Sequence, residues 1–93
     1  MRLLYALSYE SAADVFEKAP VVMSAHLQHQ RVYRDRGKLI MAGSFALMQL
    51  DGFLAIFTNR AAAQEFATTD PFVLEGVVKG WTIREWHESL ADA

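Results

Sequence analysis

The sequence contains no cysteine, so it has neither a disulfide framework nor a thiolate nucleophile. It also lacks an apolar run of about 18 residues and a cleavable signal pattern, so we expect no membrane insertion, no export and a cytoplasmic location. Glycine-rich phosphate loops are missing, which argues against a nucleotide. We therefore expect a protein that works without a cofactor.

The sequence also lacks a large excess of charge of either sign, because its nine basic and eleven acidic residues give a net charge of only −2. No basic stripe could neutralise a phosphate backbone, so we expect no nucleic-acid partner. Hydrophobic residues, by contrast, make up 53% of the 93 positions. A chain of this length has material for one core, and we predict a single domain over residues 1–93 with a frayed tail at 91–93.

Hydrophobic patterning predicts an α+β fold with four strands and two main helices. A short acidic segment around Ser11 is expected to form a separate helical turn that Pro20 interrupts. Gly37 is expected to end the first main helix as a left-handed cap, and Asn59 to begin the second. The predicted strands are 2–9, 39–50, 53–58 and 77–87, and the predicted helices are 24–36 and 61–67. This order is the ferredoxin-like β-α-β-β-α-β plan with a four-stranded antiparallel sheet.

The two middle strands are predicted to form a hairpin with a tight turn at Asp51-Gly52. Both faces of this hairpin are apolar, since Phe53 and Phe57 point one way while Leu54 and Ile56 point the other. Two helices can cover only one of these faces. We therefore expect a second copy of the chain to cover the other, which gives a homodimer.

His26 is the strongest candidate for proton transfer, because imidazole changes charge near neutral pH. Asp70 could accept a hydrogen bond from one ring nitrogen and leave the other facing a substrate. Both residues also have ordinary explanations: a histidine early in a helix can bond locally, and Asp70 followed by Pro71 is a good helix cap. The two carboxylate oxygens of Asp70 permit both roles.

Other polar candidates are weaker. Gly43 permits close backbone approach, and the Ser44 hydroxyl could reach a ligand or belong to an ordinary strand residue. No nucleophile elbow surrounds Ser44, so we do not expect a nucleophilic serine. His26 and His29 have a spacing that can place two imidazoles on one metal, but no third ligand stands out and we expect no metal site. Phe72 is a candidate for lining an apolar pocket.

Short matches spread along the chain resemble the YCII family (YciI-like proteins). They are His26-Leu27, Gly37-Lys38-Leu39, Ala42-Gly43 and Asp70-Pro71-Phe72-Val73. The resemblance implies a ferredoxin-like fold, a dimeric α/β barrel, and a cleft in which His26 and Asp70 are catalytic. Three positions depart from the family pattern. Met23 stands where an arginine is frequent, which makes a carboxylate ligand less expected, Ser44 replaces a proline, and Gln30 replaces a core leucine.

These observations favour a cofactor-independent enzyme in which His26 moves a proton on a small, cyclic or aromatic metabolite and Asp70 orients it. Lyase or isomerase chemistry suits such a pair. The alternative is a small-ligand-binding or dimeric interaction module without catalysis. A further alternative is a cofactor-free oxygenase, because dimeric barrels of similar plan include enzymes that oxidise aromatic substrates.

Overall fold

The computed structural model describes residues 1–90, so the predicted fraying of 91–93 lies outside the described residues. Four antiparallel strands form one sheet in the order β2-β3-β1-β4. The elements in chain order are β1 (Arg2–Ser11), α1 (Val15–Asp35), β2 (Leu39–Ser44), α2 (Met48–Asp51), β3 (Phe53–Phe57), α3 (Arg60–Thr69), α4 (Pro71–Leu74) and β4 (Val78–Glu88). The predicted ferredoxin-like plan is confirmed, with α2 and α4 as short additions.

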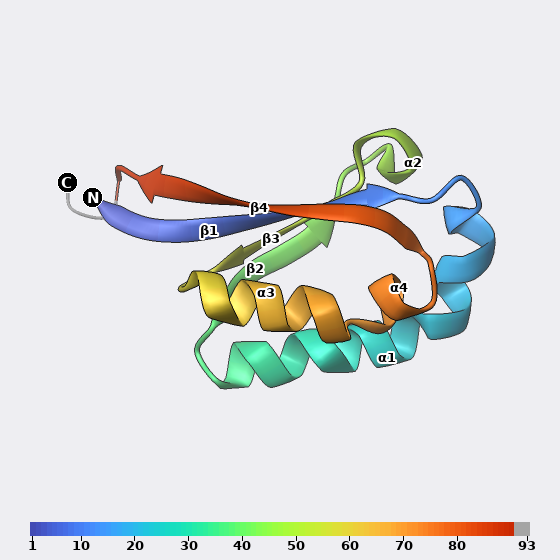
Figure 1. Ribbon diagram of the computed structural model, residues 1–93, viewed down its shortest axis with the longest axis horizontal. Coiled ribbons are helices and arrows are strands. Elements are labelled where there is room, and N and C mark those ends of the chain that lie inside the picture. Colours follow the sequence, from blue (N-terminus) through green and yellow to red (C-terminus); the bar gives the residue numbers. More distant parts are fainter. Residues whose placement is uncertain (91–93) are drawn as a thin grey trace.

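The long helices α1 and α3 and the short α4 lie together on one side of the sheet (Figure 1). The strands place alternate residues toward these helices, so that Leu7 pairs with Ala55 and Tyr9 with Phe53 on the covered face. Leu7, Phe57, Phe66 and other apolar side chains fill the space between the two layers. The main core therefore lies between the helices and one face of the sheet. Within residues 1–90 no helix combines the length and apolarity needed to cross a membrane.

Helix α1 is continuous from Val15 to Asp35, so the predicted separate turn around Ser11 is wrong. Ser11 ends β1 instead, and its hydroxyl donates to the carbonyl of Met48. Pro20 lies inside the helix and its ring removes one backbone hydrogen bond. The first turn survives because Val15 and Ala19 are buried in the core on its other side.

Gly37 ends α1 as expected, with a positive φ of 71°. Its amide donates to the carbonyl of Arg34, and the amide of Lys38 donates to that of Tyr33. This pair of hydrogen bonds is a Schellman motif, which provides donors for carbonyl groups that have no partner within the last turn of the helix. Asn59 also caps α3 as predicted, since its side chain accepts from the amide of Ala62.

Strand β2 ends at Ser44, six residues earlier than predicted, and the tight hairpin at Asp51-Gly52 is wrong. The short helix α2 occupies the connection, and Gly52 closes it with φ 74° and ψ −142°. A Cβ at Gly52 would collide with the backbone carbonyl of Tyr9. Asp51-Gly52 therefore signals a helix end and a close backbone approach, while the antiparallel pairing of β2 with β3 is as expected.

The face of the sheet opposite α1, α3 and α4 also carries apolar residues (Figure 1). Leu4 and Ile56 point to this face and are buried, yet they lie outside the main core cluster. Met41 pairs with Ile56, and Trp86 pairs with Leu4, so these two side chains share the face. Both are about half exposed or more, at 61% and 48%. Apolar side chains are therefore exposed on this face, as the sequence predicts.

Candidate active site

His26 and Asp70 are in contact although 44 positions separate them in the chain. The Nδ1 atom of His26, on the middle of α1, lies 2.8 Å from Oδ1 and 3.1 Å from Oδ2 of Asp70. Asp70 occupies the junction of α3 and α4, where its extended backbone ends one helix and begins the next. Pro71 at the first position of α4 favours this break, since proline disfavours helical geometry in the residue before it. The sequence Asp70-Pro71 thus turns the carboxylate toward α1.

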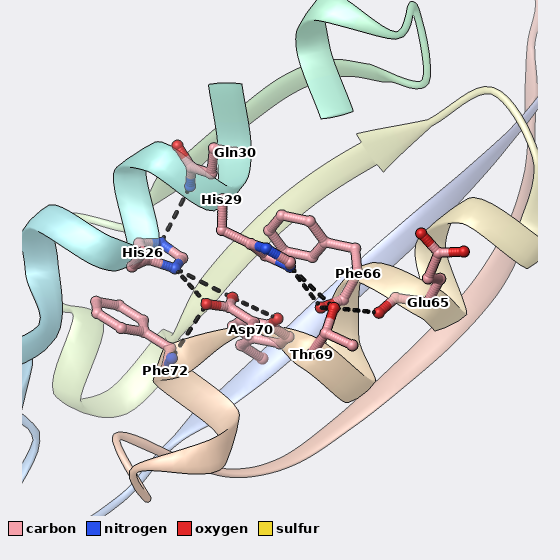
Figure 2. Close-up of polar contacts among 9 residues, drawn as sticks. His26, His29, Gln30, Glu65, Phe66, Thr69, Asp70 and Phe72 are labelled. Carbon is pink, nitrogen blue, oxygen red and sulfur yellow. Dashed lines mark hydrogen bonds and ion pairs between the residues drawn. The ribbon is translucent and has the colours of Figure 1, made fainter. Parts of the chain in front are cut away.

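The Asp70 carboxylate is fully buried and accepts hydrogen bonds from three directions (Figure 2). Besides His26, the Tyr9 hydroxyl donates to Oδ2 at 2.7 Å and the amide of Phe72 donates to Oδ1 at 3.0 Å. A carboxylate surrounded by donors accepts from all of them when it is ionised. The geometry is therefore compatible with both roles considered for Asp70, as a helix cap and as a partner of His26. One carboxylate caps α4 and also contacts His26.

Tyr9 remains a hydrogen-bond donor in this environment. Burial, the negative charge of Asp70 and the hydrogen bond to it raise the pKa of the Tyr9 phenol well above its ordinary value. The hydroxyl therefore keeps its proton at any physiological pH. Tyr9 donates to Oδ2 of Asp70 and Phe72 donates to Oδ1, while Nδ1 of His26 contacts both oxygens.

The imidazole of His26 is held on both its face and its edges. Its ring stacks on the ring of Phe72, with centroids 3.6 Å apart and planes inclined by 6°. Because a carboxylate only accepts, Nδ1 carries the proton and Nε2 has the free electron pair. The side-chain amide nitrogen of Gln30 lies 3.1 Å from that Nε2 and donates to it. The arrangement selects one tautomer, with Nε2 as the basic atom.

A cavity of about 220 Å³ opens beside the ring of His26, between α1 and the sheet. Most of its wall is apolar, with Leu7, Met23, Phe53 and Phe72 among the lining residues. The polar groups of the wall come from Tyr9, His26, Gln30 and Ser44. A small apolar cavity with a few convergent polar groups is the usual form of a small-molecule site.

The structure places all five candidate residues at this cavity or behind it. Gly43, Ser44 and Phe72 line the wall together with His26, while Asp70 lies behind the ring of His26. The Ser44 hydroxyl makes no hydrogen bond within residues 1–90 and is available to a ligand. Its neighbour Phe45 already bonds back to Gly52 as the strand ends.

His29 takes a different direction from His26. Its Nε2 lies 3.0 Å from the carbonyl oxygen of Phe66 and 3.2 Å from the Thr69 hydroxyl, so it ties α1 to the end of α3 (Figure 2). No group of three or more histidine, aspartate or glutamate side chains is arranged to hold a metal ion within the described part of the chain.

Two polar residues of the site are not among those predicted to line it. Tyr9 looks like one of several alternating strand residues, and only the pairing of β1 with β3 places it against Asp70. Gln30 had a signal, because it departs from the apolar residue that the family pattern carries there. It lies one helical turn after His26, which is the spacing at which two side chains on a helix meet.

The family follows from comparison with known proteins. The profile of the YCII-related domain matches residues 2–87, so this chain belongs to that family. Protein YciI of Escherichia coli O6:H1 is 30% identical over 92 residues, covering 88% of this chain and 94% of that protein. The family resemblance expected from the short motifs is thereby confirmed.

Solved structures with the same fold are more distant in sequence. The 5-chloro-2-hydroxyhydroquinone dehydrochlorinase TftG from Burkholderia phenoliruptrix, solved with 2,5-dihydroxybenzoquinone, superposes with a TM-score of 0.74 at 15% identity over 92% of this chain and 95% of that one. A NIPSNAP family protein from Agrobacterium tumefaciens gives a TM-score of 0.58 at 12% identity over 96% of this chain and 94% of that one. These likenesses support the α+β fold with an open four-stranded sheet.

Proposed function

We propose that this chain is a cofactor-independent enzyme that transfers protons on a small cyclic or aromatic metabolite, in lyase or isomerase chemistry. The observation that carries the proposal is the contact of His26 Nδ1 with the buried Asp70, which leaves Nε2 as the basic atom at the cavity. His26 is the catalytic residue, and Asp70 is a positioning residue that acts through it. Tyr9 supports Asp70 from the sheet.

The proposed step is a proton abstraction. Nε2 takes a proton from a carbon or hydroxyl of the substrate, and the electron pair of the broken bond moves into the ring system. In a lyase reaction that pair expels a leaving group from the adjacent carbon, and the imidazolium gives its proton to that group or to water. In an isomerase reaction the imidazolium returns the proton to another atom of the substrate. Asp70 compensates the positive charge that the ring holds between the two steps.

The size and composition of the cavity support a small substrate. A volume of about 220 Å³ is below the range of drug-sized pockets and suits one ring with a few substituents. The ring of Phe72, already stacked on His26, and the side chain of Phe53 offer aromatic surface to such a ring. Ser44 and Gln30 offer hydrogen bonds to its hydroxyl or carbonyl groups.

The test is proton exchange in deuterium oxide with a panel of hydroxylated ring compounds. The panel includes 2,5-dihydroxybenzoquinone, which TftG binds, and 5-chloro-2-hydroxyhydroquinone, on which TftG acts by its name. Proton NMR should show deuterium uptake, elimination or rearrangement of at least one compound. His26→Gln should slow that reaction by at least about 100-fold, in line with the loss of a general base. His87→Gln is the matched control, because His87 is exposed and its side chain pairs with that of Glu85, away from the cavity lining.

Other outcomes of the same panel select the alternatives. Binding of a compound with no exchange, equal in the wild type and His26→Gln, would overturn the proposal in favour of a ligand-binding module. Oxygen consumption during turnover, followed with an oxygen electrode, would replace proton transfer with cofactor-free oxygenation.

We also propose that the chain is a homodimer whose copies meet through the face of Met41, Ile56 and Trp86. The exposed apolar side chains of Met41 and Trp86, on the face of the sheet opposite α1 and α3 (Figure 1), support this arrangement, since exposed apolar patches mark interaction surfaces. Sedimentation velocity at micromolar concentration should give the mass of two chains. Met41→Glu should give a folded monomer, and a monomeric wild type would contradict the proposal.

A further inference from the structure

A second groove, of about 330 Å³, adjoins the cavity. It lies between the second half of α1 and the edge strand β2, whose residues 39–42 form its floor. Leu27, Gln30 and Ala42 line both the cavity and the groove. The side chains of Leu27 and Gln30 thus stand at the boundary between the cavity and the groove, where a ligand that occupies both would pass.

The groove differs from the cavity in its charge. Arg31 and Arg34 are the only charged residues that line it within the described part of the chain, and no carboxylate does. None of the described residues that line the cavity is an arginine or a lysine, and its α1 side consists of Met23, His26, Leu27 and Gln30. Among the described residues that line the cavity or the groove, the arginines are therefore those of the groove, in a chain whose net charge is −2.

Arg31 has no partner for its guanidinium among residues 1–90, neither a hydrogen bond nor an ion pair. The Arg34 guanidinium pairs with the carboxylate of its neighbour Asp35 at 3.2 Å, and both side chains are largely exposed. Exposed ion pairs of this kind contribute little to stability, so their side chains readily form other contacts. Both guanidinium groups can therefore turn to a ligand, and each presents two parallel donors that fit a carboxylate or a phosphate.

We infer that this groove is an anion subsite, in which Arg31 and Arg34 hold a carboxylate or phosphate arm of the substrate while its ring lies beside His26. The inference rests on the proposed function, because it assigns the ring to the cavity. His26 and Arg31 are five residues apart on α1, which is about 7.5 Å along the helix axis and about 140° around it. The acidic arm must therefore pass around the helix beside Gln30, and the substrate class is a small ring with an acidic arm that can reach past this residue.

Basic residues near the end of a helix also have a plain structural use, because they offset the partial negative charge of its last carbonyls. Such a role affects the stability of the helix and has no ligand preference. A measurement of ligand preference therefore separates the two roles.

The experiment compares two probes of the same shape, 3-(4-hydroxyphenyl)propionate and its neutral amide. Binding is followed by NMR on the side-chain amide signals of Gln30, which lines both the cavity and the groove and is present in every variant. The wild type should bind the carboxylate at least about tenfold more tightly than the amide, as expected for a charge-assisted hydrogen bond. Arg31→Gln should remove most of this preference without weakening the amide, and Arg31→Lys should restore part of it. A third probe, 2-(4-hydroxyphenyl)ethyl phosphate, distinguishes a phosphate arm from a carboxylate arm by its relative affinity.

Arg84→Gln is the matched control, because it removes the same charge from β4, at the opposite edge of the sheet from β2. It should leave the preference intact. Equal binding of carboxylate and amide by the wild type, or an unchanged preference in Arg31→Gln, would overturn the inference. So would the absence of binding by all three probes at millimolar concentration.

These failures differ from a failure of the proposed function. If probes bind without charge preference while His26-dependent exchange is present, only the anion subsite is wrong. If the charge preference is present while His26→Gln exchanges as fast as the wild type, only the catalytic role is wrong.

Discussion

The Tyr9 hydroxyl donates a 2.7 Å hydrogen bond to Asp70 Oδ2 across 61 positions of the chain. This bond joins the central strand β1 to the junction of α3 and α4, and Asp70 in turn contacts His26 on α1. The sheet and both helical segments therefore meet at one buried carboxylate. The orientation of His26 depends on all of them.

Removing the hydroxyl in Tyr9→Phe should lower the free energy of unfolding by about 1–3 kcal/mol, because it takes a donor from a buried carboxylate. Denaturant unfolding near neutral pH measures the difference. Tyr5→Phe, at the other half of the same strand, is a control that leaves Asp70 its donors. An unchanged stability of Tyr9→Phe would mean that the bond contributes nothing.

The raised pKa of Tyr9 also predicts a change of stability with pH. In the unfolded chain this phenol ionises near its ordinary pKa of about 10, while in the folded protein it stays neutral. The contribution to stability is therefore complete below pH 10 and is lost as the pH rises above it. Between about pH 9 and pH 11 the wild type should lose more stability than Tyr9→Phe. If the free energy of unfolding fell equally with pH in the wild type and in Tyr9→Phe, the result would contradict the burial of Tyr9.

Asp70→Asn should reverse the tautomer of His26. The Asn side chain keeps an oxygen to cap Phe72, but its amide group donates to Nδ1, so that the ring proton moves to Nε2. Nitrogen NMR of labelled histidine should show Nδ1 protonated in the wild type and Nε2 protonated in the variant. Asp35→Asn, which removes an exposed carboxylate, should leave the tautomer as it is. The same tautomer in wild type and Asp70→Asn would mean that Asp70 does not orient the ring.

Gln30 adapts to either state of His26 because its amide can donate to Nε2 or, after rotation, accept from it. Gln30→Glu can only accept, so it should favour a proton on Nε2 and slow any reaction that needs Nε2 as a base. Gln30→Leu should leave Nε2 free and slow the reaction less. The measurement compares the rates of proton exchange that the two variants give with the same substrate. A Glu variant as fast as the Leu variant would show that Gln30 does not act on Nε2.

Gly52→Ala should destabilise the fold by at least about 2 kcal/mol, because Gly52 has a conformation that other residues avoid. The new methyl group would also meet the carbonyl of Tyr9, next to the residue pair that supports the site. Gly43→Ala is the matched control: nothing lies within 4 Å of its added methyl, and its cost should stay below about 1 kcal/mol. Equal losses in thermal unfolding would contradict the special role of Gly52.

Local patterns were enough to predict most elements of this fold. The alternation in β1, the glycine cap at Gly37 and the cap at Asn59 each depend on neighbouring residues only, and each is present. The errors arose where tertiary packing outweighs a local signal. Pro20 stays in a helix because Val15 and Ala19 anchor it, and Gly52 serves a contact with β1 that no local pattern reveals.

The candidate site also contains some residues that could be predicted from the sequence and others that could not. His26 and Asp70 stand out through their chemistry and the family motifs, and a pairing of this kind could be expected before the structure was known. The support from Tyr9 could not, because it depends on the register of β1 against β3. The groove beside Arg31 depends on the path of the edge strand β2 along α1, which is a property of the packed chain.

The most direct test of the central claim, that Asp70 acts through His26, is a double-mutant cycle on the exchange reaction in deuterium oxide. Asp70→Asn should slow exchange by about 100-fold or more in the wild type and have almost no effect in a His26→Gln background, since residues that act as a unit are not additive. Circular dichroism should first show that each variant is folded. Equal slowing by Asp70→Asn in both backgrounds, or a His26→Gln variant as fast as the wild type, would contradict the account.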